Sequence, residues 1–353
     1  REFLVGPLQS GLQGPSGSRS TQCRLGNRTS RSWAGVIGLT TAIRLRESGF
    51  SVTVVAEHQS PDITSDRAGA VFSPFRVDGR AEAYDWTQAS YVRYRHLINE
   101  RPECGVSLSP VTEFFFTPLD VDPWWATLVD EFERVKIAPE PYADAVRAVM
   151  PKMNMRIYMP WLVRDFTERL GGTIESARLD ALDELFERGF DIVVNCSGVG
   201  AAQLANDAAV TPYRGQILRV ANTLKLKECL VEESRGAITT YVFPFEDYVV
   251  LGGTFEKNEF EMTCSREAID AIIERCGTLL RAAGVRDIDR LAEERIASLA
   301  GLRPCRVINE NPETIRLELE ARPNGHIIHD YGHGRAGVTL SWGCAEAVAA
   351  LVG

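Results

Sequence analysis

Gly35 and Gly38 stand at the start of a segment whose apolar residues recur at helical spacing, and Glu57 follows 19 positions after Gly38. The spacing predicts a helix from about Val36, and residues 50–56 then read as a buried strand that ends at Glu57. Glycines at a helix N-terminus let the backbone approach a pyrophosphate, and an acid about 20 residues further on accepts a hydrogen bond from a ribose hydroxyl. The pattern predicts the second half of a βαβ dinucleotide-binding unit.

The first half of that unit is missing from its usual place, because Trp33 occupies the position of the first glycine in a turn that has no room for an indole. The run Phe3-Leu4-Val5-Gly6 is short and apolar and ends in glycine, and joining Gly6 to Ala34 would restore the full G-x-G-x-x-G after a strand. We therefore expect Pro7 to Trp33 to be an insertion or a retained intron within an atypical segment, residues 1–33. A genuine arm, a transit peptide or a disordered segment would share its Ser- and Arg-rich composition.

Three later segments could also contact a cofactor or substrate. A strand at residues 191–194 leads into a polar turn that contains Ser197 and Gly198, and residues 332–337 hold three glycines ahead of a helix expected from about Ser341. Backbone N–H groups before a helix favour negative charge. The guanidinium of Arg303, next to a proline, is suited to binding a carboxylate with two hydrogen bonds.

Other kinds of chemistry have little support. The eight cysteines form no C-x-x-C pair, and the five histidines show no ligand spacing with them, so we expect free thiols in a reducing compartment and no metal site. The sequence contains no Ser/His/Asp or paired-carboxylate motif for acid–base or nucleophilic catalysis.

Length and composition narrow the function further. At roughly 150 residues per domain, 353 residues predict two structural units, and 44% hydrophobic residues are typical of a globular chain. The net charge of −9 argues against a nucleic acid or an anionic membrane as the main partner. No apolar run is long enough for a membrane span, and no secretory leader is expected. Small molecules are the expected ligands.

Taken together, the segments resemble the D-amino-acid oxidase family of flavoproteins, which includes D-aspartate oxidase, over nearly all of residues 34–353. The matching motifs are Ala34-Gly35-Val36-Ile37-Gly38-Leu39, Asp66-Arg67-Ala68-Gly69-Ala70 through Pro74, Asn195-Cys196-Ser197-Gly198-Val199, Arg214-Gly215-Gln216, Tyr241-Val242-Phe243-Pro244, Leu251-Gly252-Gly253-Thr254, Gly301-Leu302-Arg303-Pro304, and Tyr331-Gly332-His333-Gly334 with Ser341-Trp342-Gly343. Most are short, and their order and spacing make the resemblance specific.

The resemblance implies FAD and the oxidation of a D-amino acid to a 2-oxo acid and ammonia, while O₂ reoxidises the flavin and yields hydrogen peroxide. The Cα hydrogen would leave as hydride to flavin N5, so no residue is expected to act as a catalytic acid or base. Arg303 and the Tyr241 hydroxyl would bind the substrate carboxylate, and the Arg335 carbonyl would accept from its amine. The implied cofactor-binding residues are Gly6, Gly35, Val36, Ile37, Gly38, Glu57, Asp66, Arg67, Ala68, Gly69, Leu179, Ser197, Gly198, Gly332, His333, Gly334, Gly337, Val338 and Thr339.

Departures from the family pattern bear on the substrate. Ala237 stands where vertebrate members carry a second tyrosine, and Phe255 stands where D-aspartate oxidases carry an arginine. Val71 and Ser73 fall where the family lines the side-chain pocket, so we expect neutral or apolar D-amino acids. Arg235 lies close enough in sequence to Tyr241 to leave an acidic substrate as an alternative. D-aspartate oxidase, a related amine oxidase such as glycine oxidase, and a chain inactivated by residues 7–33 are the rival interpretations.

The resemblance also implies an α/β fold, with a Rossmann-like FAD-binding domain and a smaller α+β substrate domain that contains an antiparallel sheet. The first would take residues 34–76, 150–212 and 300–353, and the second residues 77–149 and 213–299. The pairing of residues 241–245 with 248–252 is predicted as a hairpin. A homodimer, and a peroxisomal or cytoplasmic location, are consistent with the family; no S-K-L-like ending is present.

Overall fold

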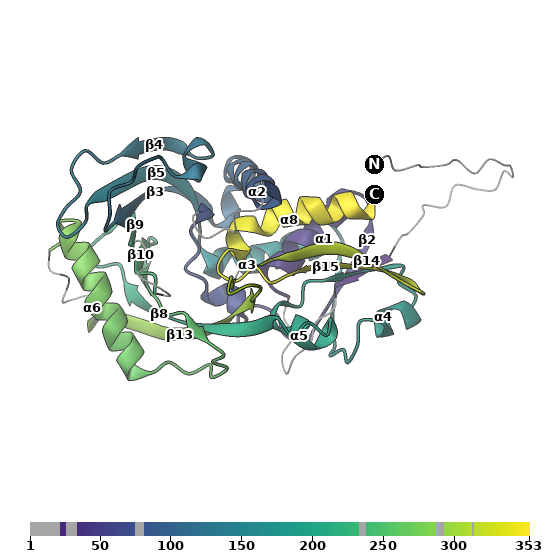
Figure 1. Ribbon diagram of the computed structural model, residues 1–353. Coiled ribbons are helices and arrows are strands. Elements are labelled where there is room, and N and C mark those ends of the chain that lie inside the picture. The colour runs from purple at the N-terminus through teal and green to yellow at the C-terminus, as the bar shows by residue number, and fades with distance from the viewer. Residues whose placement is uncertain are drawn as a thin grey trace, which may run out of the picture.

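The computed structural model describes residues 22–25, 34–74, 81–232, 238–286, 288, 293–312 and 314–353, the first range by its backbone alone. Its strands form two sheets that lie toward opposite ends of the molecule (Figure 1). Mixed sheets and helices of this kind are consistent with the expected α/β class.

The first sheet has six strands in the order β14-β15-β7-β1-β2-β6. All neighbouring pairs are parallel except β14 with β15, so the antiparallel strand lies at an edge. The bounds are β1 Gln22–Leu25, β2 Ser51–Ala56, β6 Thr173–Ser176, β7 Ile192–Asn195, β14 Arg316–Arg322 and β15 Gly325–Tyr331. The strands predicted at residues 50–56 and 191–194 are confirmed as β2 and β7.

The central strand differs from the sequence prediction. β1, Gln22–Leu25, lies between β7 and β2, with Leu25 opposite Val194 on one side and Val54 on the other. The sequence predicts that Phe3 to Val5 supplies this strand, and that run lies outside the described residues. A central strand pairs its backbone groups with a neighbour on each side, and Gln22–Leu25 does so with β7 and β2.

Two long helices, packed together, cover one side of this sheet. α1, Val36–Glu47, begins at the predicted residue, and α8, Gly337–Val352, begins four residues before the predicted Ser341. The hydroxyl of Thr40 on α1 donates to the carbonyl of Ser341 on α8 at 3.1 Å. Val338 and Thr339 therefore belong to the first turn of a helix rather than to the loop ahead of it.

The second sheet follows the order β12-β8-β11-β10-β9-β3-β5-β4, with β13 paired to β8. It is antiparallel apart from β3 with β9. The predicted hairpin is confirmed by the pairing of β10 with β11. The bounds are β3 Val106–Phe115, β4 Asp130–Arg134, β5 Asp144–Met153, β8 Val210–Ala221, β9 Cys229–Glu232, β10 Tyr241–Pro244, β11 Tyr248–Gly252, β12 Glu256–Lys257 and β13 Arg295–Arg306.

Helix α6, Arg266–Ala282, packs on this second sheet (Figure 1). Its buried positions, Ile269, Ile272, Cys276 and Leu279, recur at helical spacing and share a core with Leu218, Val249 and Leu251 of the sheet. The other α-helices among the described residues are α2 Ala81–Glu100, α3 Met155–Arg164, α4 Glu184–Glu187 and α5 Ala201–Leu204.

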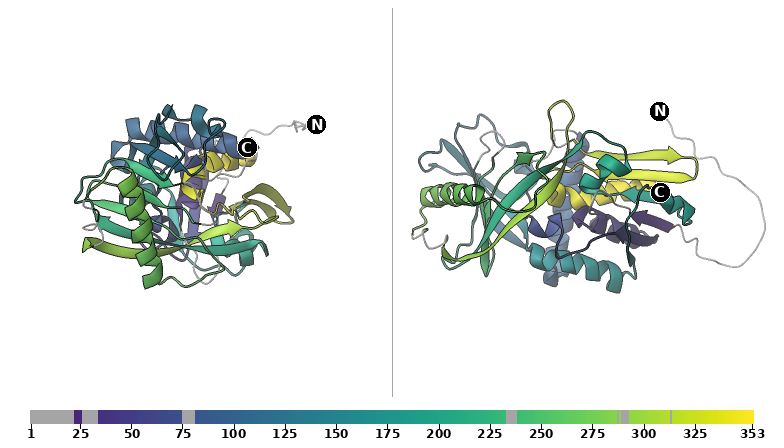
Figure 2. Two further views of the ribbon diagram at one scale, coloured as in Figure 1. Left: turned by 60° about the vertical axis from the view of Figure 1, so that its left-hand side comes forward. Right: turned by 90° about the horizontal axis from the view of Figure 1, so that it is seen from below.

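β8 and β13 are the long pair that connects the two halves of the molecule, as the view from below shows (Figure 2). Each has 12 residues, and they are antiparallel over almost their full length. The domain boundaries expected at residues 150, 212 and 300 fall within β5, β8 and β13. Each of these strands continues across the expected boundary without a break.

Two further findings concern the described part of the chain. None of its helices is both long and apolar enough to cross a membrane. Its seven cysteines with described side chains form no disulfide, in agreement with the thiols expected from sequence.

Candidate functional site

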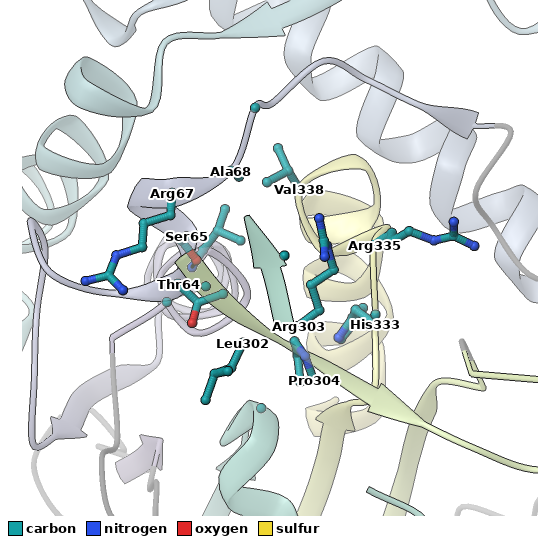
Figure 3. Close-up of a pocket in the computed structure, with 18 of the residues that line it drawn as sticks. Thr64, Ser65, Arg67, Ala68, Leu302, Arg303, Pro304, His333, Arg335 and Val338 are labelled. Carbon is teal, nitrogen blue, oxygen red and sulfur yellow. Dashed lines mark hydrogen bonds between the residues drawn. The ribbon is translucent and has the colours of Figure 1, made fainter. Parts of the chain in front are cut away.

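A cavity of about 720 Å³ lies where the two sheets meet, a size in the usual range for a small-molecule site. Figure 3 shows residues from distant parts of the chain around it: Thr64, Ser65, Arg67 and Ala68 on one side, residues 302–304 of β13 below, and His333 and Val338 near the start of α8. Parallel strands ending at one sheet edge, next to helix N-termini, are a common place for nucleotide binding.

The start of α1 forms one wall. Gly35 is its N-cap, and the first helical N–H, on Val36, donates to Oγ of Ser65 at 3.0 Å. Thr64 and Ser197 also line this wall, and the hydroxyl oxygen of each is buried without a hydrogen-bond partner in the described structure. Buried hydroxyls normally have partners, so two unpartnered hydroxyls on residues of this wall are consistent with a polar ligand such as a phosphate or a ribose.

The start of α8 forms the opposite wall. Gly337, Val338 and Thr339 line the cavity in the first helical turn, and Oγ1 of Thr339 accepts from the backbone N–H of Ser73 at 3.0 Å. The unpaired N–H groups of a helix N-terminus favour negative charge. This end of the cavity is therefore suited to the anionic ring of a reduced flavin.

Arg303 enters the cavity from β13 and points toward Val338 (Figure 3). Its register partner on β8 is Tyr213, and its guanidinium lies over Gly215, two residues further on the same face. A Cβ at position 215 would overlap the guanidinium. Nη1 donates to the carbonyl of Thr254 at 2.8 Å, which holds the side chain and leaves other donors of the guanidinium for a ligand.

Tyr241 has an equivalent relation to a glycine on the neighbouring strand. It lies directly opposite Gly252 in the β10–β11 ladder, and a Cβ at position 252 would overlap the phenol ring. The ring stacks on Phe243, with centroids 4.6 Å apart. Burial raises the pKa of Tyr241, and the nearby charge on Arg303 opposes that rise. The phenol therefore keeps its proton and can donate to a carboxylate beside Arg303.

Phe255 also faces the cavity and contacts two guanidinium groups. Its ring centroid is 4.5 Å from Cζ of Arg335 and 5.6 Å from Cζ of Arg303. A ring face in this position attracts cations. In Figure 3 the Arg335 side chain extends away from Arg303, so the two guanidinium groups do not converge on one point.

Most residues predicted from the sequence come together around this cavity. Those that line it are Gly35, Val36, Ile37, Gly38, Arg67, Ala68, Gly69, Ser197, Gly198, Tyr241, Arg303, His333, Gly334, Arg335, Gly337, Val338 and Thr339. Val71, Ser73 and Phe255, singled out as pocket positions, line it too.

Four predicted residues lie outside the cavity wall. Asp66 is buried and accepts from Oγ of Ser60 at 2.6 Å and from the backbone N–H of Ile63 at 3.0 Å, so it holds its own loop, and burial raises its pKa. Leu179 packs in a separate core with Val55 and Val193. Glu57 follows the end of β2, and Gly332 turns the chain with a φ of 89°. Gly6, Arg235 and Ala237 lie outside the described residues.

The sequence prediction missed two kinds of feature. Thr64 and Ser65 line the cavity and were left out, although they immediately precede a quoted motif. Asp330, His333 and Cys344 showed no metal-ligand spacing, yet the fold buries all three with their ligand atoms within 4.8 Å of one another. Asp330 and His333 are only three residues apart in sequence, whereas Cys344 lies in α8, so the packing of α8 against β15 brings its thiol to the other two.

Comparison with known proteins agrees with the geometry. Residues 34–351 match the family DAO, described as FAD dependent oxidoreductase. A D-amino-acid oxidase of Rubrobacter xylanophilus is 41% identical over 325 residues, which cover 90% of this chain and 94% of that protein. A human D-aspartate oxidase is 32% identical over 336 residues, 90% of this chain and 92% of that one. A glycine oxidase structure from Bacillus cereus aligns with a TM-score of 0.73 at 20% identity, over 95% of this chain and 97% of that chain.

Proposed function

The chain belongs to the DAO family of FAD-dependent oxidoreductases, and from that premise we propose that it oxidises D-amino acids to 2-oxo acids, ammonia and hydrogen peroxide. The observation that carries this proposal is the position of Arg303 and Tyr241 in the same cavity as the starts of α1 and α8. The cavity combines a carboxylate-binding pair with two helix N-termini suited to a dinucleotide.

The residues around the cavity fit FAD. Thr64 and Ser197 offer hydroxyls without partners of their own in the described structure, beside the α1 N-terminus where a pyrophosphate is favoured. Gly337 to Thr339 would hold the flavin end against the start of α8. Bound FAD supplies the acceptor for the hydride that leaves the substrate Cα, and passes the two electrons to O₂ as hydrogen peroxide.

The chain's own residues would bind and orient the amino acid. The guanidinium of Arg303, anchored to Thr254, would bind the substrate carboxylate, and the Tyr241 hydroxyl would donate to the same group. The Arg335 carbonyl would accept from the amine, which fixes the Cα–H direction. Holding the reacting atoms in this geometry is the contribution that the reaction needs, since no acid or base has to be supplied.

The lining of the cavity supports neutral or apolar substrates. Val71, Ile217, Val231 and Phe243 present apolar side chains to it, and Phe255 stands beside Arg303. These side chains would leave a second carboxylate without a partner, which is costly in a buried site.

A second candidate, oxidation of acidic D-amino acids, is favoured by one observation. The half-buried Arg335 side chain borders the cavity with its guanidinium 4.5 Å from the Phe255 ring. Arg335 would then be the side chain that supplies a second cation to an acidic substrate.

Peroxide assays on the purified chain with D-alanine, D-aspartate and glycine test these alternatives. We expect a yellow protein that turns over D-alanine faster than D-aspartate or glycine. A preference for D-aspartate would favour the second candidate. A folded but colourless protein that stays inactive with added FAD would contradict the oxidase function altogether.

Arg303→Lys tests the site itself. Lysine keeps the charge but cannot form two parallel hydrogen bonds to a carboxylate, so we expect kcat/KM to fall at least tenfold while flavin absorbance stays. Unchanged kcat/KM would contradict the carboxylate role of Arg303. Ser298→Ala, on the same strand but outside the cavity wall, is the matched control.

Residues 7–33 remain, in our proposal, an insertion within the phosphate turn. Deleting them joins Gly6 to Ala34 but also removes β1, Gln22–Leu25. If Phe3 to Val5 supplies the strand of the original unit, the deletion variant should fold and bind FAD at least as tightly as the full chain. An unfolded deletion variant would show that Gln22–Leu25 is the required strand.

A further inference from the structure

The backbone of Gly253 and Thr254, directly after β11, lines the cavity and lies against both residues proposed to bind the substrate carboxylate. The Thr254 carbonyl accepts from Nη1 of Arg303 at 2.8 Å. A Cβ at position 253 would lie only 3.0 Å from the hydroxyl oxygen of Tyr241. A shift of this backbone would therefore move the guanidinium or press on the phenol, so its position sets the geometry of the carboxylate-binding pair.

Hydrogen bonds from separate parts of the chain hold this backbone. The N–H of Gly253 donates to the carbonyl of Thr239 at 2.9 Å, and the N–H of Thr254 donates to the carbonyl of Gln216 on β8 at 3.3 Å. The Gly253 carbonyl accepts from Nη2 of Arg275 on α6 at 3.1 Å. With the Thr254 carbonyl bound as above, each of the four backbone polar groups has a partner, and the Gly253 carbonyl depends on the helix for its own.

Arg275 is a half-buried cation whose hydrogen bond among the described residues goes to the Gly253 carbonyl. Its Nε is buried without a hydrogen-bond partner there, and no carboxylate of the described residues forms an ion pair with it. The next residue, Cys276, faces the same place, because its thiol donates to the carbonyls of Tyr241 at 3.5 Å and Gly252 at 3.6 Å. Two consecutive residues of α6 therefore hold the start of β10 and the end of β11 beside the cavity.

We propose that Arg275 is a positioning residue for the carboxylate-binding pair: its hydrogen bond holds the backbone of residues 253–254, which anchors Arg303 and limits where the Tyr241 phenol can lie. A guanidinium is suited to this task, since a charged donor makes a stronger hydrogen bond to a carbonyl than a neutral one does. Arg275 lies outside the cavity wall, so it would contact neither substrate nor cofactor. The inference rests on the proposed function, because it assigns Arg303 and Tyr241 to the substrate carboxylate.

Carboxylate affinity of the holoenzyme tests the proposal. Benzoate carries a carboxylate and no amine, and it is titrated into the wild type and into Arg275→Met while the visible flavin spectrum is followed. Methionine removes the donor, so we expect the Kd for benzoate and the KM for the best D-amino acid to rise together by about three- to tenfold, with kcat changed by less than about twofold. An unchanged Kd would overturn the proposal.

Arg275→Lys separates the loss of the donor from the change of side chain. Lysine keeps a charged donor on a side chain of similar reach, so benzoate affinity should return to within about twofold of the wild type. A loss as large as that of Arg275→Met would overturn the proposal. Arg281→Met, the same substitution at an exposed position of α6, is the matched control and should leave the Kd unchanged. An equal loss there would show that removing any positive charge from α6 weakens binding, against the proposal.

A double-mutant cycle with Arg303→Lys tests the route of the effect. If Arg275 acts through the anchoring of Arg303, Arg275→Met should weaken benzoate binding by a smaller factor in the Arg303→Lys background than in the wild type. Equal factors in the two backgrounds would overturn this route and with it the proposal.

FAD affinity distinguishes positioning from a general structural role. The Kd of the apoprotein for FAD should be the same in Arg275→Met and the wild type, and a loss equal to the loss for benzoate would overturn the proposal. Arg275→Gln, with a shorter and uncharged side chain, replaces Arg275→Met if that variant does not fold, and the same loss of benzoate affinity is expected. If the wild-type holoenzyme neither binds benzoate nor oxidises a D-amino acid, the proposed function fails; if it binds benzoate and the Arg275 variants bind it equally well, only this inference fails.

Discussion

The guanidinium of Arg303 occupies space that position 215 leaves open only because it is a glycine. The two residues are diagonal neighbours on one face of the β8–β13 ladder, where side chains of adjacent strands are in reach of one another. The Arg-Gly-Gln and Gly-Leu-Arg-Pro motifs are therefore two parts of one arrangement.

Gly215→Ala should displace Arg303 from Thr254 without unfolding the sheet, because the group that must move is the end of a flexible side chain. We expect kcat/KM for the best D-amino acid to fall about tenfold, mainly through KM, with flavin retained. Gly301→Ala, at the paired position of the same ladder, places its Cβ 3.5 Å from Cγ2 of Thr64, an ordinary contact, and should have a much smaller effect. Equal effects of the two changes would show that the space over residue 215 is unimportant. Steady-state kinetics and flavin absorbance measure both.

Tyr241→Phe should lower kcat/KM by about tenfold at most, since a hydrogen bond contributes roughly 0.5–1.5 kcal/mol net. Burial raises the pKa of Tyr241 above its usual value near 10, so the phenol stays protonated in mildly alkaline solution. The ratio of wild-type to Tyr241→Phe activity should therefore stay constant up to about pH 10. A ratio that collapses between pH 8 and 10 would contradict this. Tyr248→Phe, whose hydroxyl donates to Asn154 at 2.9 Å away from the cavity, is the control.

Thr64→Val and Ser197→Ala should each weaken FAD binding, by up to about tenfold, because each removes one hydroxyl that we expect to pair with the cofactor. The stability of the apoprotein should hardly change, since neither hydroxyl has a partner there. Equilibrium titration with FAD measures the affinity. Ser298→Ala removes another buried hydroxyl without a partner, but one outside the cavity wall, and should leave FAD affinity unchanged.

His329 should make the folded protein less stable in mild acid. Its ring is fully buried between Asn195, 3.2 Å from Nδ1, and Glu320, 3.0 Å from Nε2. Burial lowers its pKa below the usual value of about 6.5, and the charge on Arg316 acts in the same direction. As the pH falls, the imidazole of His329 therefore binds a proton more readily in the unfolded chain than in the folded chain.

Because the unfolded chain binds the proton more readily, protonation lowers the free energy of unfolding. This contribution to stability is complete above about pH 6.5 and is lost as the pH falls toward the lower folded-state pKa. His329→Gln should flatten the fall in urea midpoint between pH 7.5 and 5.5. His96→Gln removes an exposed histidine that pairs with Glu100 on α2, and this variant should leave the fall in urea midpoint unchanged. An unchanged slope in His329→Gln would show that other groups set the acid sensitivity.

Local patterns in the sequence determined α1, β2, β7 and the β10–β11 hairpin, because their periodicity and the glycines that flank them are readable from neighbouring residues alone. The order of short motifs likewise identified the family and most of the residues that line the cavity. These features depend on chain-local geometry or on a resemblance that spans nearly the whole chain.

Other features depended on how distant segments pack. The strand between β7 and β2 proved to be Gln22–Leu25, a segment that has no apolar run to announce a buried strand. The need for glycine at positions 215 and 252 becomes clear only from the strand register, which places these residues beneath Arg303 and Tyr241. Asp330 had no signal in the sequence at all. Its closeness to Cys344 follows from α8 packing against β15, which brings the thiol and the carboxylate within 4.8 Å of each other, and such closeness is a property of the tertiary structure alone.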